Sequence, residues 1–515
     1  MGGSLRRHVG CDLIDIYPGP GLWSSKLHEV LQPRSHILME PDEGVYAPFL
    51  QNLLSRPNTT FIPKSGIIWS DLSRILDPAY LPHQVEQPPD VSKTPQRNDT
   101  LLLTANLAFH PKKRFHSFDS VATLVLFQFL SSIRASSLLQ KYGLVRMLLW
   151  VGEDDKRTII ARSCQHRRRM AVDGELATDW INEVAGPDED DAAKKHYGRD
   201  HAIDRGSVRR ALSRMRAAGI DIPRGRESGL VKEVQETAEK ESGQQQAFVV
   251  RPYLEELEGL EAAFAKGEIQ PKSAALKRLL ALRYRLTREL KLGDTALRLL
   301  RERDALAAAH EAGEDPDGTL RREREWDAEI LGMNKNLRSE ILGMRDNLHL
   351  FQQEPPVMNW DRRELVPLTV KSTEFFPNAP CSLLDIQPKA MHPLLRAMGP
   401  RSSRAGDTFE LVLRGMMDCG SEPVSKAIET VWPGAAEGVL PHCPSLRDRS
   451  KGGMPLSGYG EISVRTLNET QWVEILDAWM KWPFRPTFPQ LVSRMADDST
   501  AELADDDGDG LGETL

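Results

Sequence analysis

The chain has 515 residues, of which 40% are hydrophobic and 27% are charged, as in an ordinary soluble protein with room for two or three domains. No apolar run approaches the roughly 20 residues that a membrane helix needs. The five cysteines are scattered and never in C-x-x-C spacing, so the sequence indicates neither a disulfide framework nor a metal site. The net charge of −7 comes from the tail, because residues 497–515 hold eight acids and no base.

The first predicted strand, 12–16, runs into the turn Tyr17-Pro18-Gly19-Pro20-Gly21 and then a predicted helix over 22–31. A second apolar run ends in Glu40. Glycines let the backbone approach a ligand at the end of a strand, and an acid closing the next strand accepts hydrogen bonds from two ribose hydroxyls. The pattern favours a nucleoside-cofactor site over a plain turn. Ser24 stands where a dinucleotide motif has its third glycine, so S-adenosylmethionine fits better.

Residues 11–160 alternate strands and helices as an open, parallel α/β sheet requires. The predicted helices cover 22–31, 43–54 and 119–139. The predicted strands lie at 12–16, 36–39, 61–62 with 67–69, 101–104 and 144–151.

The second chemical motif follows the strand at 101–104, where the chain reads Asn106-Leu107-Ala108-Phe109. The exocyclic amine of a base is a poor nucleophile, because its lone pair is delocalised into the ring. An Asn oxygen and a nearby backbone carbonyl can accept its two hydrogens, while an aromatic face stacks the base. Asn106 and Phe109 are therefore the candidate catalytic residues for methyl transfer to an extruded base.

Basic charge is clustered in the body of the chain. Residues 111–169 hold twelve Lys/Arg against four Asp/Glu, and 205–226 hold seven Arg against one acid, Asp221. Clusters of this kind usually form a solvated face, but their repetition makes a polyanionic partner an equal alternative.

The remaining chain divides by composition. A charged, helical insertion is expected over 188–350, where a stripe from Trp326 to Leu348 indicates one helix face. A second stripe, Leu279 to Leu290, is surrounded by Lys and Arg and fits a nucleic acid, an acidic partner or solvent equally well. Strand-like segments at 365–372 and 382–387 complete the sheet domain. The expected units are 11–187, 188–350, 351–390, a helical domain at 391–495 and a disordered acidic tail at 496–515.

These motifs together resemble the rRNA adenine N(6)-dimethyltransferase family, which includes the mitochondrial transcription factor B proteins and their fungal counterparts. The resemblance is carried by P-G-P-G at 18–21, the strand-ending Glu40, N-L-x-F at 106–109 and F-x-P-x-x-P-x-S at 375–382. It implies a Rossmann-like methyltransferase sheet, here with a long helical insertion and a C-terminal helical domain that helps to hold nucleic acid. It also implies S-adenosylmethionine contacts from Asp15, Gly19, Gly21 and Glu40, and a target-base pocket at 106–109.

Three departures from the family pattern separate two possible functions. Ala108 replaces the usual proline, Lys64-Ser65-Gly66 stands where a Gly-Asp pair is usual, and the upstream Gln/Asn-Phe segment is absent. They favour a transcription initiation factor that binds promoter DNA and works with mitochondrial RNA polymerase, in the mitochondrion and away from membranes. The alternative is an active rRNA adenine N(6)-methyltransferase for the mitochondrial small-subunit rRNA. Clustered basic charge disfavours a small-molecule methyltransferase.

Overall fold

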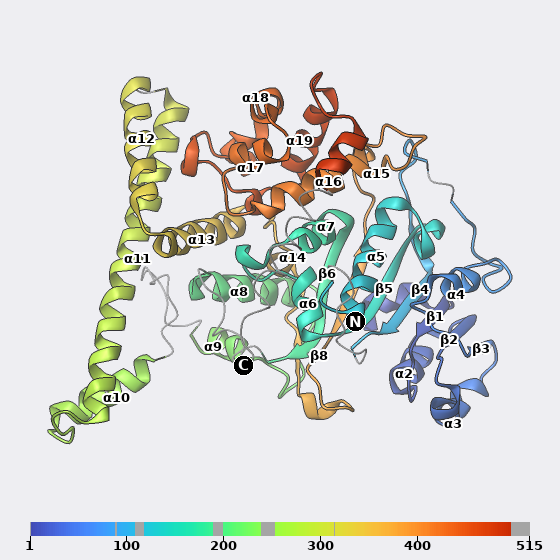
Figure 1. Ribbon diagram of the computed structural model, residues 1–515. Helices are drawn as coiled ribbons and strands as arrows, with labels where there is room; N and C mark the ends of the chain where they lie inside the picture. Colours follow the sequence, from blue (N-terminus) through green and yellow to red (C-terminus); the bar gives the residue numbers. More distant parts are fainter. Residues whose placement is uncertain are drawn as a thin grey trace, which may run out of the picture.

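The computed structural model describes residues 2–87, 90–108, 118–188, 199–237, 253–313 and 315–495. Its centre is one eight-stranded mixed sheet with the order β3-β2-β1-β4-β5-β8-β6-β7 (Figure 1). The strands are β1 Asp12–Ile16, β2 Ser35–Met39, β3 Thr59–Ile62, β4 Arg97–Asn106, β5 Leu144–Gly152, β6 Thr178–Pro187, β7 Leu368–Val370 and β8 Cys381–Pro388. β8 runs antiparallel between β5 and β6, and the other pairs are parallel. The predicted α/β class is confirmed.

Helices cover both faces of the sheet because its strands are apolar on both sides. Odd-numbered β1 residues such as Leu13 pack against α2, whereas Ile14 and Ile16 pack toward α4 and α5. The sheet-flanking helices are α1 Gly2–Leu5, α2 Leu22–Leu31, α3 Glu43–Leu54, α4 Trp69–Ile75, α5 Val121–Ala135, α6 Glu153–Ile159 and α7 Arg169–Ala177. Within the described residues, only the stretch 121–142, which begins with α5, is long and apolar enough to cross a membrane, and half of it is buried inside the protein.

Two strand predictions need correction. The expected strand at 67–69 is wrong, because the Ile68 amide hydrogen-bonds to the Ser65 carbonyl in a turn and α4 begins at Trp69. β6 has no counterpart among the predicted strands. It contains the buried polar residues Asn182 and Glu183, which break the apolar pattern.

Glu183 is compatible with burial because two cations surround it. Its Oε1 lies 2.8 Å from Lys156 Nζ, and its Oε2 lies 2.6 Å from Arg162 Nη2. The attraction of Lys156 and Arg162 outweighs the opposing effect of burial and lowers the pKa of the Glu183 carboxyl to about 2. Across the neighbouring strand pair, Arg146 on β5 donates to Asp385 on β8, at 2.7 Å for Nε. Ion pairs therefore join the sheet where β8 enters it.

The segment after the first six strands is helical. Its helices are α8 His201–Ala217, α9 Gly229–Thr237, α10 Leu254–Ala265, α11 Ala274–Ala312, α12 Pro316–Gly332, α13 Lys335–Gln352 and α14 Asn359–Arg362. The 39-residue α11 stands along one side of the molecule, α12 returns beside it, and α13 crosses toward the sheet (Figure 1). The stripe from Trp326 to Leu348 is not one helix face. The chain breaks at Met333, and the Asn334 side chain caps α13 by accepting from the Leu337 amide at 2.9 Å.

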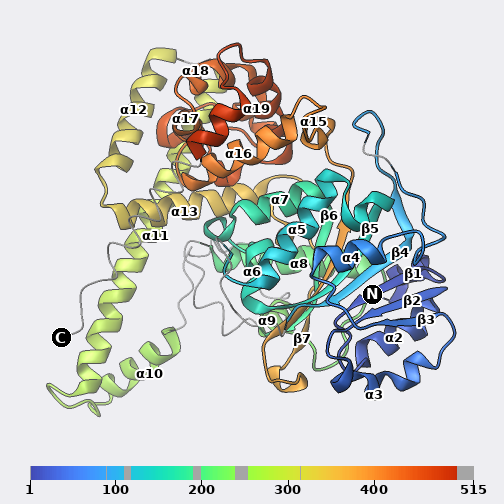
Figure 2. The same cartoon turned by 45° about the vertical axis from the view of Figure 1, so that its right-hand side comes forward.

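The C-terminal part is a compact group of short helices above the sheet (Figure 2). It contains α15 Pro393–Arg396, α16 Ala405–Asp418, α17 Val424–Val431, α18 Ala435–Val439 and α19 Glu469–Lys481. Trp472 and Trp479 of α19 are fully buried, and Phe409 of α16 meets Trp472 edge to face, with ring centroids 5.7 Å apart. Their core is continuous with the α5 side of the sheet. The expected acidic tail, 496–515, lies outside the described residues.

Candidate functional site

The loops after β1, β2 and β4 meet at one edge of the sheet. Ile16 at the end of β1 pairs in register with Met39 on one side and Ala105 on the other. The chain leaves β1 for β2 in one direction, and β4 lies in the other direction. Ligands of open α/β sheets bind at such a switch point, outside the carboxyl ends of the strands. The structure thus brings the glycine turn, Glu40 and Asn106 to this switch point, where open α/β sheets have their crevice.

Glu40 holds the turn after β1. Its Oε2 accepts from the Gly19 amide at 3.2 Å, and its Oε1 accepts from the Asp42 amide at 3.2 Å. Burial raises the pKa of this carboxyl above its ordinary value, although the two amide hydrogen bonds oppose the shift. Both carboxylate oxygens already serve the protein's own backbone, and each retains capacity for a further donor.

The two predicted glycines adopt backbone conformations that favour glycine. Gly19 has φ of 54° and Gly21 has φ of 75°. A Cβ on Gly21 would lie only 2.6 Å from Leu50 Cδ2 of α3. Gly21 therefore permits α2 to begin close against α3, in addition to keeping the turn free of side chains.

Asp15 is placed differently from Glu40 and the glycines. It is buried within β1, with Oδ2 3.5 Å from Nε2 of His36, a distance too long for a hydrogen bond. His36 in turn lies 3.0 Å from His28 of α2, measured between their Nδ1 atoms. Asp15 contributes charge to the crevice, because it helps to raise the pKa of Glu40.

Tyr17 was not among the predicted site residues. It has φ of 57°, a left-handed conformation that is uncommon outside glycine, and its hydroxyl lies 2.6 Å from Ser65 Oγ. This contact joins the loops after β1 and β3 across β2. Its sequence signal was an aromatic residue at the first position of the glycine turn.

Asn106 ends β4 and is half-buried. Its Oδ1 accepts from the Ala108 amide at 3.3 Å, and the Leu107 amide bonds to the Trp150 carbonyl at 2.8 Å. Phe109, the other candidate catalytic residue, lies outside the described residues.

An aromatic group stands beside Asn106. Trp150 of β5 pairs with it in register, and the Trp150 ring meets Trp23 and Phe375 edge-on, with centroids 5.7 and 5.5 Å away. Phe375 opens the F-x-P-x-x-P-x-S motif. The fold therefore brings this late motif to the same edge as Asn106.

Several of the described basic side chains in the two clusters face inward. Arg167 is buried, donates to Glu175 at 2.6 Å and also bonds to the carbonyls of Arg465 and Leu467. Buried or bridging arginines of the two clusters include Arg134, Arg146, Arg162, Arg205 and Arg214. Much of the expected polyanion-binding charge is thus internal. Arg168, Arg216 and Arg224 are exposed.

The basic stripe of α11 also has an internal partner. Leu279 and Leu282 are buried against α10. Arg278 pairs with Glu256 at 2.6 Å and Arg283 with Glu261 at 2.5 Å, both on α10. For these two arginines, the acidic partner is therefore the preceding helix, α10.

Comparison with known proteins finds similarity over the segment that forms the first six strands of the sheet. Residues 10–187 match the family model described as ribosomal RNA adenine dimethylase. Mitochondrial transcription factor 1 of Saccharomyces cerevisiae is 26% identical over 168 residues, which are 32% of this chain and 45% of that protein. The Lachancea kluyveri protein of the same name is 24% identical over 170 residues, with the same coverage. The matched segment thus spans under half of each relative. Over this segment the chain resembles the ribosomal RNA adenine dimethylase family, on its mitochondrial transcription factor branch.

Proposed function

We propose that the protein is a mitochondrial transcription initiation factor: a methyltransferase-fold protein that binds promoter DNA and acts with the mitochondrial RNA polymerase. The carrying observation is the match of the crevice-bearing segment to relatives named mitochondrial transcription factor 1. Mitochondrial localisation belongs to the same proposal.

The geometry of the crevice supports this reading. Tyr17 places a side chain at a left-handed position of the turn and ties it to Ser65. Each carboxylate oxygen of Glu40 accepts one hydrogen bond from the loop backbone. Both features stabilise the turn without any ligand. A factor that keeps the fold but catalyses no reaction needs such a turn.

The alternative function is methylation of adenine N(6) in mitochondrial small-subunit rRNA. It is favoured by Asn106 at the strand end with Trp150 and Phe375 beside it, since an amide oxygen and aromatic faces are what a flipped base requires. Asn106 would hold the amine of the base, and Phe109 would stack on it. Asn106 and Phe109 would together form the catalytic site of this alternative function.

The residues of the crevice fit S-adenosylmethionine in kind. Glu40 would accept from the ribose hydroxyls, Gly19 and Gly21 would keep the turn open to the cofactor, and Asp15 would add negative charge beneath it. The bound cofactor would supply an electrophilic methyl group. A buried carboxylate with unused acceptor capacity is the observation that permits this assignment.

One pair of assays separates the two functions. Purified wild type and Asn106→Ala are compared for promoter-dependent transcription with mitochondrial RNA polymerase and for methyl incorporation into small-subunit rRNA. In a factor, transcription is supported and no methylation is detected with either protein. In an enzyme, Asn106→Ala lowers turnover by ~100-fold or more at nearly unchanged RNA affinity, because the side chain acts on charge that develops during reaction.

Robust methylation by wild type that Asn106→Ala abolishes would overturn the factor assignment. Asn52→Ala is a matched control, because Asn52 lies on α3 and is exposed to solvent.

A further inference from the structure

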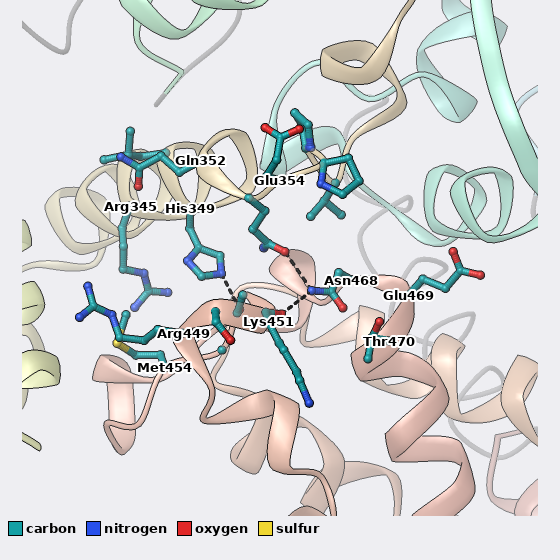
Figure 3. A pocket seen from close by; sticks show the side chains of 18 of the residues that line it. Arg345, His349, Gln352, Glu354, Arg449, Lys451, Met454, Asn468, Glu469 and Thr470 are labelled. Carbon is teal, nitrogen blue, oxygen red and sulfur yellow. Dashed lines mark hydrogen bonds between the residues drawn. The ribbon is translucent and has the colours of Figure 1, made fainter. Parts of the chain in front are cut away.

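A cavity of 720 Å³ lies away from the crevice, where the sheet domain, the helical insertion and the C-terminal helices meet. α11 and α13 form one wall, the segment 353–357 another, and the 449–454 loop with the start of α19 a third (Figure 3). Its volume is in the range of small-molecule sites, which occur preferentially at domain interfaces.

Polar contacts hold these walls together. Nε2 of His349 lies 2.9 Å from the Gly452 carbonyl oxygen. The Asn468 amide donates to Gln353 Oε1 at 2.9 Å and to the Lys451 carbonyl at 2.8 Å (Figure 3). The cavity is therefore bounded by elements that are tied to one another.

The lining is rich in positive charge, with six cationic side chains against four acids. Two of the acids are already engaged, Glu175 with Arg167 and Glu469 with Lys389. The other two, Asp304 and Glu354, are exposed. The lining as a whole thus has two more cationic than anionic side chains.

Three guanidinium groups form the core of this charge. Arg303 is 4% exposed, and Arg345 and Arg449 both repel its charge. Arg345 is buried, pairs with Asp346 at 2.7 Å and donates to the Tyr459 carbonyl, and Arg449 lies 3.4 Å from Glu311. Burial, with the repulsion from Arg345 and Arg449, lowers the pKa of Arg303 to about 9.

Arg303 has no carboxylate at ion-pair distance among the described residues, although Asp346 and Asp304 act on its charge from farther away. Its Nε donates to the Gly460 carbonyl at 2.8 Å and its Nη2 to the Glu461 carbonyl at 3.4 Å. Its Nη1 has no hydrogen-bond partner among the described residues, and none of their carboxylates pairs with it. A buried cation is costly unless it is paired, so an anion in the cavity would stabilise this cluster.

Part of the lining is apolar. Leu348, Pro355, Pro356 and Met454 contribute surface that has no charge to satisfy. A ligand that suits both parts has an anionic end and a flat, weakly polar body. A nucleotide has this combination, with phosphates for the guanidinium groups and a base for the apolar surface.

We propose that this cavity binds a nucleotide through its phosphate groups, with Arg303, Arg345 and Arg449 as the phosphate contacts. The nucleotide is either free or the 5′-phosphorylated end of a single nucleic-acid strand, which present the same chemistry. The assignment is independent of the crevice and of S-adenosylmethionine.

The test is calorimetric titration of the full-length protein with ATP, adenosine and a 5′-phosphorylated oligodeoxythymidylate. Arg449→Gln is the test variant, because its side chain is exposed and its pair with Glu311 is also exposed, so we expect the variant to fold. Arg447→Gln is the matched control: Arg447 is exposed two residues earlier and does not line the cavity. Arg303→Gln serves as a second variant, with circular dichroism to check folding.

Loss of one charged hydrogen bond to phosphate should weaken binding about tenfold or more in Arg449→Gln and leave Arg447→Gln unchanged. If ATP shows this loss, the ligand is a free nucleotide; if only the oligonucleotide shows it, the ligand is a strand end. Adenosine should bind much more weakly than ATP. Equal binding of both probes by wild type and Arg449→Gln, absence of binding by both probes, or adenosine binding as tight as that of the phosphorylated probe would overturn the proposal.

Discussion

The buried Glu183 offers a quantitative test of how the sheet is held together. Glu183→Gln removes the negative charge that Lys156 and Arg162 share, and it leaves these two cations with one acid, Glu153, at 2.7 Å from Lys156. A pKa lowered from 4.5 to about 2 corresponds to about 3 kcal/mol of folding free energy, at ~1.4 kcal/mol for each pH unit between folded and unfolded values. We expect a loss of this size at pH 7.

The sign with pH follows from the direction of the shift. Because the folded-state pKa is depressed, the stabilisation is present above the unfolded value of 4.5 and is lost as pH falls toward 2. The difference between wild type and Glu183→Gln should fall from about 3 kcal/mol at pH 7 to under half of that at pH 3. Urea unfolding followed by tryptophan fluorescence measures it, since Trp150 and Trp180 lie on β5 and β6.

Glu374→Gln is the control for the same experiment. The pKa of Glu374 is also lowered to about 2, by hydrogen bonds from Arg226 and from the Lys371 amide, but this carboxyl is exposed. Solvent screening makes exposed ion pairs contribute little, so the control should unfold like wild type. If the Glu183→Gln protein is as stable as the control, or if its loss of folding free energy does not change with pH, the Glu183 ion pairs do not stabilise the sheet in the way described.

Three further predictions concern binding and stability. If S-adenosylmethionine binds, Glu40→Ala should weaken it by ~1.5–3 kcal/mol in a titration, because a charged acceptor is lost, and unchanged affinity would remove Glu40 from the site. Arg168→Gln should reduce the slope of log affinity against log salt by ~0.9 on duplex DNA if the exposed Arg168 neutralises a phosphate; an identical slope would assign Arg168 to a solvated face. Arg167→Gln should instead lower stability, by ~3–5 kcal/mol in urea unfolding, because it leaves the buried Glu175 without its cation. Wild-type stability would show that the Arg167 pair is dispensable.

Local sequence predicted the elements whose apolar pattern is unbroken. β1, β2 and the turn between β1 and α2 fall where hydrophobic runs and glycines place them. β6 could not be predicted from the local sequence, because Asn182 and Glu183 interrupt its apolar pattern. Glu183 can be buried because Lys156 and Arg162, which are distant in the sequence, pair with it. The break between α12 and α13 could not be predicted from the apolar spacing, because the series from Trp326 to Leu348 keeps helical spacing on both sides of it. The capping residue Asn334 was the local signal for this break.

Long-range contacts also limited how much of the candidate site could be predicted from the sequence. Register along β1, β2 and β4 follows from parallel strands, and that is why Glu40 and Asn106 could be assigned to one edge from sequence. The contact of Tyr17 with Ser65 and that of Phe375 with Trp150 join segments far apart in the chain. Inward-facing arginines such as Arg167 look like surface charge until their carboxylate partners are placed. The roles of Asp15, Gly19, Gly21, Glu40, Asn106 and Phe109 stay predictions.

The position of β8 governs the order in which this chain can fold. β5 and β6 are made early but do not pair with each other, because β8, which begins at Cys381, lies between them. During synthesis the growing chain carries two open strand edges until almost 200 further residues have been made, as the gap from Pro187 to Cys381 shows. Unpaired edges recruit other strands, so a chain that stops before Cys381 should aggregate even though it contains the whole family-matched segment. The helical insertion thus postpones completion of the sheet during synthesis, since β8 is made after it.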